Sequence, residues 1–319
     1  LGDLTRWRTN ASLPFCGRYR LIDFALSSLS NAGVHSVGVI MQRDYQSLLD
    51  HLGSGKAWDL SRRSGGLHLL PPFGVNTRGD YTGTAEALNA VISYVRNIPE
   101  SEIVLMPADI VCNLDLAAAI AQHEAGGCGI TAICRDGDVT GEHHRFLTDA
   151  HGRVTKLITS ASAGAGVAAM EIYIVNKDVL LSILDFCAQE NRFHFHRDGL
   201  FEYLGRGGTM DVFLHTGYAV RVDAVADYFA ASMDMLDPDA RASLFPADLV
   251  DDQPCGEVRP RAQRGRLESG TGLPVRRARH AHRARRAECH QVDQPLSGHG
   301  AAGGRRGRRR AVLHGRAAA

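Results

Sequence analysis

Asp109 is a candidate metal ligand because of its place in the chain. It follows the apolar run 103–106, which predicts a buried strand that ends near Ala108. Mg²⁺ prefers carboxylate and phosphate oxygens, so an Asp at the end of such a strand can hold the ion. An Asp in this position is more often a cap or a turn former when it is considered alone. The pattern therefore predicts a Mg²⁺ ligand at Asp109 and leaves a structural role open.

Gly83, Thr84 and Ala85 are candidates for nucleotide binding. They open a predicted helix over 82–97, in which apolar residues recur at helical spacing. A glycine at a helix start lets the backbone approach a nucleotide closely, and the first amides of the helix point at anions. Thr84 can equally be an ordinary N-cap. Gln42, at the end of the apolar run 34–42, is a further candidate because open α/β sheets bind ligands beyond the carboxyl ends of their strands.

The elements that must position these residues alternate between strands and helices. Short apolar runs predict strands over 34–42, 103–106, 129–134, 153–158, 170–175 and 212–222. Helical spacing predicts helices over 44–52, 82–97, 116–125, 178–188 and 224–236, whereas 58–70 is expected to be irregular. This alternation predicts an α/β fold with a Rossmann-like, doubly wound mixed sheet.

The composition is that of a globular protein, and 44% of the 319 residues are hydrophobic. No apolar run approaches the ~20 residues that span a bilayer, so no membrane association is expected. The seven cysteines are odd in number and lack paired C-x-x-C spacing, which favours a reduced, cytoplasmic setting. The chain starts without Met or a signal pattern, and we interpret it as a fragment.

The charge divides the chain into a domain over 1–245 and a tail over 246–319. Residues 251–319 contain 16 Arg, no Lys, six acidic residues and no Phe, Tyr, Trp, Ile or Met. Such a segment cannot bury enough apolar surface to offset its ordering entropy, so we expect disorder. Its Arg-Ala-Gly bias resembles GC-rich coding sequence read out of frame after about Asp248. A nucleic-acid-binding tail is the alternative, but the segment has no aromatic residues interleaved for base stacking.

Several motifs together resemble those of ADP-glucose pyrophosphorylases (glucose-1-phosphate adenylyltransferases). The stretch 13–33, which reads L-P-F-C-G-R-Y-R-L-I-D-F-A-L-S-S-L-S-N-A-G, is similar to the family's entry loop and first helix. Residues 81–87 resemble W-Y-R-G-T-A-D-A, which lines the ATP site of the family, and 105–115 resemble L-A-G-D-H-I-Y-K-M-D, whose first Asp holds the catalytic metal. Residues 217–234 resemble G-Y-W-R-D-V-G-T-I-x-x-Y-W-E-A-N-M-D. The resemblance covers about 1–245 and implies a nucleotidyltransferase-type domain.

The chain departs from the family pattern where the family binds phosphates, sugar and metal. The first strand and the Gly-rich phosphate loop are missing, and Asn10 stands where the family has Lys. The family's A-S-M-G becomes Ala-Ala-Met-Glu, which puts Ala169 and Glu171 in place of Ser and Gly. Counted without gaps from Gly217, Arg221 falls where the family has its second metal-binding Asp.

These departures resemble the non-catalytic, D-type subunit that some bacteria pair with a catalytic pyrophosphorylase subunit in glycogen synthesis. The resemblance implies a regulatory chain whose partner is that catalytic subunit and whose binding of ATP and glucose 1-phosphate is weak or absent. It implies Mg²⁺ as the family's cofactor, with Asp109 as the one remaining ligand. The family's C-terminal left-handed β-helix is expected to be absent or not formed. The alternative is an active sugar-nucleotide nucleotidyltransferase with an unconventional site.

Overall fold

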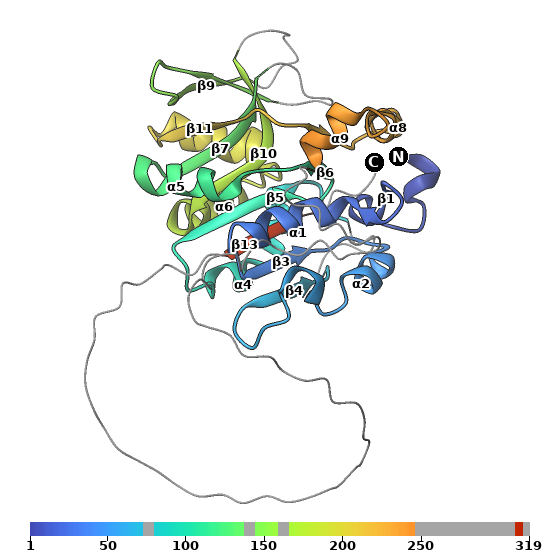
Figure 1. Ribbon diagram of the computed structural model, residues 1–319. Coiled ribbons are helices and arrows are strands. Elements are labelled where there is room, and N and C mark those ends of the chain that lie inside the picture. The colour runs from blue at the N-terminus through green and yellow to red at the C-terminus, as the bar shows by residue number, and fades with distance from the viewer. Residues whose placement is uncertain (73–79, 137–143, 159–165, 246–309, 315–319) are drawn as a thin grey trace, which may run out of the picture. The chain divides into compact units, whose positions relative to one another are not determined.

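A computed structural model describes residues 1–72, 80–136, 144–158, 166–245 and 310–314. All the described elements belong to one compact unit (Figure 1). Its centre is a nine-stranded sheet whose main path runs β11-β7-β10-β5-β13-β3-β4, with β8 and β9 attached through β10. The bounds of the strands on this path are Ser36–Ile40 (β3), Gly66–Leu70 (β4), Glu102–Pro107 (β5), Ile130–Arg135 (β7), Val167–Asn176 (β10), Met210–His215 (β11) and Arg310–His314 (β13).

Along this path the sheet is parallel except at one strand. β10 runs antiparallel to both of its neighbours, β5 and β7, whereas the other neighbouring pairs are parallel. The hairpin of β8 (Arg145–Thr148) and β9 (Val154–Ile158) extends from β10. β3, β5 and β7 are buried along almost their whole length, because helices cover both faces of a doubly wound sheet. The predicted α/β class with a mixed sheet is confirmed.

β13 corrects the expectation that the tail over 246–319 is disordered. Residues 310–314 pair in parallel with both β3 and β5 at the middle of the sheet. Ala311 and Leu313 pack with one core cluster and Val312 with the other, as the alternation of a strand requires. In the usual doubly wound sheet the strands lie in the order 3-2-1-4, so the first strand of the chain lies between the second and the fourth. In this sheet β13 lies at that position, between β3 and β5. The remaining residues of the predicted tail lie outside the described part of the chain.

Helices cover the two faces of the sheet. α1 (Leu21–Asn31), α2 (Gln46–Leu52) and α5 (Leu116–Gly126) contribute to one core cluster. α3 (Thr84–Ala90), α4 (Ile92–Arg96) and α6 (Lys177–Gln189) contribute to the other. No helix in the described part of the chain is both long enough and apolar enough to cross a membrane.

Three local predictions differ from the structure. The segment expected to be irregular, 58–70, ends in strand β4, which pairs with β3 at the sheet edge. The helix predicted over 82–97 is two helices, because the backbone of Val91 leaves helical geometry between α3 and α4. The single run 212–222 is divided between β11 and a short strand, β12 (Ala219–Arg221), which belongs to another sheet.

Short elements at the two ends of the domain form a third cluster. The hairpin of β1 (Pro14–Phe15) and β2 (Tyr19–Arg20) turns through Cys16 and Gly17, both at positive φ. Phe15, Leu21 and Phe24 pack there with apolar residues near α8 (Val225–Asp234) and α9 (Pro238–Leu244). The Tyr228 hydroxyl also donates a hydrogen bond to the Pro14 carbonyl. The entry stretch is therefore joined to the last helices of the domain.

Candidate active site

A two-stranded ladder places Arg221 beside Asp109. β6 (Ile110–Cys112) pairs antiparallel with β12, and Arg221 stands opposite Ile110, the residue after Asp109. The backbone N–H of Val222 donates to the Asp109 carbonyl at 3.1 Å, which fixes the two strand ends. The residues that the sequence placed at the first and second metal-ligand positions are therefore neighbours in space. One of them is a carboxylate and the other a guanidinium.

Arg221 is the centre of a buried ion cluster. Its Nη1 lies 2.9 Å from Oε1 of Glu171, and its Nε lies 3.4 Å from Oδ1 of Asp223 and 3.7 Å from Oδ1 of Asp109. Asp109 and Arg221 are at most 1% exposed, and Glu171 is 3% exposed. Burial by itself lowers the pKa of the Arg221 guanidinium, but the charges of Glu171, Asp109 and Asp223 outweigh it and raise the pKa. Arg221 is therefore charged at every physiological pH.

This arrangement does not fit a Mg²⁺ ion at Asp109. Mg²⁺ needs oxygen ligands in a nearly octahedral shell, and a guanidinium supplies only donors and a positive charge. The Arg221 guanidinium, which stands at the second ligand position, already lies 3.7 Å from the Asp109 carboxylate, so a donor group replaces an oxygen ligand there. The residues around Asp109 therefore do not form a Mg²⁺ site.

A β-bulge directs Glu171 towards Arg221. The register of β10 against β7 shifts between Ala169 and Ile172, and Glu171 adopts φ +57°. A bulge re-aims the side chain at its apex, and a positive φ is a conformation that glycine adopts without cost. The Gly of the related A-S-M-G pattern suits this backbone, whereas Glu pays a steric penalty of about 1 kcal/mol or more. The ion pair with Arg221 offsets part of that penalty.

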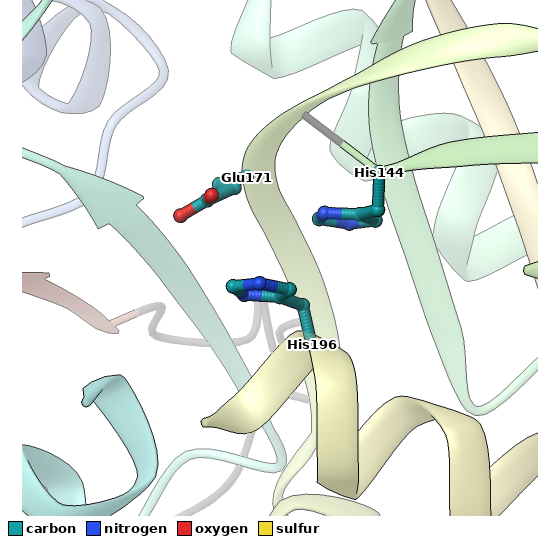
Figure 2. A group of neighbouring side chains, drawn as sticks. All are labelled: His144, Glu171 and His196. Atoms are coloured by element: carbon teal, nitrogen blue, oxygen red, sulfur yellow. The ribbon is translucent and has the colours of Figure 1, made fainter. Parts of the chain in front are cut away.

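Two histidines that the sequence did not single out lie beside Glu171. Figure 2 shows His144, Glu171 and His196, which come from three different segments, lying near one another. Their potential ligand atoms all lie within 4.8 Å of one another, and the two imidazole rings stack at 4.6 Å between centroids. The backbone N–H of Ala169 donates to the His144 carbonyl and ties this segment to the bulge. No short spacing joins His144 to His196 in the sequence, so periodicity and motif could not have found the pair.

An ion pair joins the neighbourhoods of the predicted nucleotide-binding segments. Gln42 is buried just after β3, and the next residue, Arg43, pairs with Asp80 at 3.3 Å ahead of the Gly83 turn. The N–H of Ala85 donates to the carbonyl of Phe193 at 2.9 Å, so this amide of the turn is engaged within the fold. Nucleotide contacts by Gln42, Gly83, Thr84 and Ala85 stay a prediction.

Asn10 occupies a buried position in a short 3-10 helix, Asn10–Ser12, which contacts α1 and α2. Its side chain is 3% exposed, and its Oδ1 accepts no hydrogen bond from the described residues. The neutral amide supplies no positive charge where the family resemblance expects a lysine. Ala169, the other small departure, is fully buried on β10 opposite Cys134.

Comparison with known proteins identifies the family to which this chain belongs. A family model described as nucleotidyl transferase matches residues 1–237, about three quarters of the chain. The chain belongs to the nucleotidyl transferase family. It is 28% identical over 238 residues to the glycogen biosynthesis protein GlgD of Bacillus subtilis, covering 75% of this chain and 60% of that protein. It is 32% identical over 253 residues to a glucose-1-phosphate adenylyltransferase of Thermomicrobium roseum, covering 77% and 59%.

The chain thus spans about three fifths of the length of these curated nucleotidyl transferase relatives. A solved structure titled as a putative glucose-1-phosphate thymidylyltransferase from Bacillus anthracis, in complex with a sucrose, superposes with a TM-score of 0.59. That match has 16% sequence identity and covers 74% of this chain and 90% of the other, so it supports the fold alone. The family predicted from the motifs is confirmed. Nucleotidyl transferases generally use Mg²⁺, whereas this member has the Arg221 guanidinium beside Asp109.

Proposed function

We propose that this chain is a regulatory, largely non-catalytic member of the glucose-1-phosphate adenylyltransferase group in glycogen synthesis. The observation that carries the proposal is the buried pair of Arg221 and Asp109, with Glu171 as the strongest partner of the guanidinium. A fixed internal cation takes the place beside Asp109 where a catalytic member would hold its metal. The similarity to the protein named GlgD supports the same proposal.

The charges of the reaction explain why replacing the metal beside Asp109 with Arg221 should abolish turnover. Transfer of an adenylyl group to glucose 1-phosphate brings two phosphate anions together, and cations must stabilise the charge that develops. The charge of Arg221 is already used by three carboxylates, and Asn10 adds none. Loss of one preorganised donor commonly costs ~100- to 1000-fold in rate. The combined losses should therefore leave negligible catalysis.

The proposed partner is a catalytic glucose-1-phosphate adenylyltransferase subunit. A chain with a preserved scaffold and an altered pocket can still shift a partner's conformational equilibrium through differential contacts, commonly by ~1–3 kcal/mol. Sedimentation of the chain with the catalytic subunit from the same organism tests this directly. Co-sedimentation with altered kinetics of the catalytic subunit supports the regulatory role, whereas independent sedimentation with unchanged kinetics contradicts it.

Pyrophosphate release from ATP, glucose 1-phosphate and Mg²⁺ tests the non-catalytic part of the proposal. The purified chain should release no more pyrophosphate than its Asp109→Ala variant. Release that depends on Mg²⁺ and disappears in Asp109→Ala would contradict the proposal. The same assay with a known catalytic enzyme controls for inhibitors in the preparation.

An active nucleotidyl transferase with an unconventional site is the second candidate. It is favoured by one observation, because Arg221 places a permanent positive charge where a metal would otherwise supply one. The candidate requires that charge to reach the phosphates of the substrate, whereas Arg221 is only 1% exposed and faces three carboxylates. Metal-independent pyrophosphate release that is lost in Arg221→Met would establish it.

A further inference from the structure

We propose that His144, Glu171 and His196 form a binding site for a divalent transition-metal ion such as Zn²⁺. The site is separate from the predicted Mg²⁺ position at Asp109 and goes beyond the regulatory role proposed above. The ligand atoms of the three side chains lie within 4.8 Å of one another (Figure 2). Two imidazole nitrogens and one carboxylate oxygen form a ligand set that Zn²⁺ and its neighbours use in proteins, with a remaining position open to water or a ligand.

The fold brings the three side chains together from segments far apart in the sequence. His144 immediately precedes β8, Glu171 stands on the bulge of β10, and His196 belongs to the helical turn Phe195–Leu200. His144 and Glu171 are each 3% exposed, and only His196 is partly open to solvent. A metal here would be held by a rigid buried pair and approached from the side of His196.

Tyr173 assigns which nitrogen of His144 would face the metal. The Tyr173 hydroxyl lies 2.6 Å from Nε2 of His144, and its ring packs against both His144 and Phe195. Ligating histidines are usually oriented by such a hydrogen bond from the ring nitrogen that does not bind the metal. Coordination would therefore use Nδ1 of His144, with Tyr173 as its outer-shell partner.

The charge around Glu171 favours a dication. The ion pairs of Arg221 join one guanidinium to three carboxylates, which gives these four side chains a formal charge of −2. Buried carboxylates attract a nearby cation strongly because little water screens them. Arg221 contacts Oε1 of Glu171 at 2.9 Å, so the same carboxylate would bridge the guanidinium and the bound ion.

Metal binding requires the imidazole ring of His196 to rotate. The two imidazole planes are nearly parallel, with an angle of 3° between them, whereas each nitrogen lone pair lies in the plane of its own ring. Zn–N bonds of ~2.0–2.1 Å place tetrahedral ligand atoms about 3.3 Å apart, which is closer than the 4.8 Å limit seen here. His196 is the more exposed ring, so rotation of its side chain is the movement that closes the site.

Titration of the full chain with Co²⁺ tests the proposal by visible absorption. The wild type should bind one Co²⁺ that Zn²⁺ displaces, with ligand-field bands and no intense thiolate charge-transfer band. His196→Gln and Glu171→Gln should each weaken this binding by more than the ~10- to 100-fold that loss of an outer-shell partner costs. Tyr173→Phe, the outer-shell variant, should fall within that smaller range.

His194→Gln is the matched control because His194 lies near His196 without belonging to the ligand group. Its ring centroid is 6.3 Å from that of His196. This variant should bind Co²⁺ like the wild type, and Zn²⁺ should raise the melting temperature of both but not that of His196→Gln. Binding that survives His196→Gln, or that carries a thiolate band, would overturn the proposal by placing the metal elsewhere. A wild type that binds no Co²⁺ would overturn it outright.

Discussion

The start of α1 and the Arg221 cluster both pair an arginine with an aspartate, but they use the pair differently. At α1, Asp23 accepts a hydrogen bond from the Arg20 backbone N–H and contacts His51, while the Arg20 guanidinium donates to Ser47 on α2. Arg20 and His51 are partly open to water, and the contacts join the hairpin, α1 and α2. At the sheet edge, Arg221 is buried among three carboxylates.

The comparison separates residues that build the scaffold from residues that alter the pocket. The Arg20 and Asp23 contacts lie in the stretch that follows the family pattern, and they join that stretch to α2. The Arg221 and Glu171 contacts lie at positions that depart from it. The two departures are partners in one ion pair of 2.9 Å, so they form a single structural change.

Removal of the guanidinium should give the largest loss of stability. Arg221→Met leaves Asp109 and Glu171 buried without their cation, and breaking a buried pair in this way commonly costs about 3–5 kcal/mol of unfolding free energy. Urea unfolding followed by circular dichroism measures the loss. Arg20→Met at the first region is the matched control, and we expect about 1–2 kcal/mol because its partners remain in contact with water. Equal losses at the two sites would remove the distinction between the regions.

The next largest loss of stability should come from substitution of Gly83, a tightly packed glycine in a stretch that matches the family pattern. A Cβ added at Gly83 would lie 2.2 Å from the Phe193 carbonyl oxygen, so Gly83→Ala must displace the backbone. Overpacking of this kind costs about 1–3 kcal/mol. Gly205→Ala, where a Cβ would meet nothing within 4 Å, should lose no stability. A Gly83→Ala variant as stable as the wild type would show that the loop of Phe193 adapts freely.

The cap of α1 should contribute less than either of these. Asp23→Ala removes the acceptor of the Arg20 N–H and the partner of His51, and loss of a cap of this kind costs about 1–2 kcal/mol. Asp50→Ala on α2, whose carboxylate accepts an exposed Gln46 bond within the same helix and no other bond from the described residues, should cost less than about 0.5 kcal/mol. If the two aspartates cost the same in urea unfolding, the motif residue has no special role in joining α1 to α2.

A fall in pH should lower the stability of the fold slightly through His215, which precedes β12. Burial lowers the pKa of His215 below its ordinary 6.5. The unfolded chain therefore binds this proton more readily, so His215 favours folding above pH 6.5 and this contribution is lost as the pH falls. Unfolding midpoints in urea at pH 7.5 and 5.5 should differ less in His215→Gln than in the wild type. An unchanged difference would assign the pH dependence to other groups, such as His35, whose pKa burial also lowers.

The sequence predicted strands and helices where the spacing of apolar residues agreed with their burial in the fold. The apolar runs at β3, β5, β7 and β10 gave the sheet, because strands buried on both faces are apolar throughout. The proximity of Asp109 to Arg221 followed from the two stretches, 105–115 and 217–234, that resemble the family's metal-binding segments. β13 could not be predicted, since its short apolar core lies in an arginine-rich segment and only its position between two strands buries it. The pairing of His144 with His196 depends on a bulge and a distant helical turn, neither of which leaves a periodic signal.

Manganese binding measured by electron paramagnetic resonance tests most directly whether Arg221 replaces the metal at Asp109. Two proteins should be compared, one with Arg221 and Glu171 intact and one with Arg221→Asp and Glu171→Gly. Both should carry His196→Gln, so that the site proposed at the histidines does not contribute. The double change supplies a second carboxylate beside Asp109 and returns glycine to the positive φ of the bulge.

The protein with Arg221 should leave the free Mn²⁺ signal unchanged at millimolar concentration. The protein with Arg221→Asp and Glu171→Gly should bind one Mn²⁺, and a further Asp109→Ala change should abolish that binding. Tight Mn²⁺ binding by the protein with Arg221, lost on Asp109→Ala, would contradict the central claim.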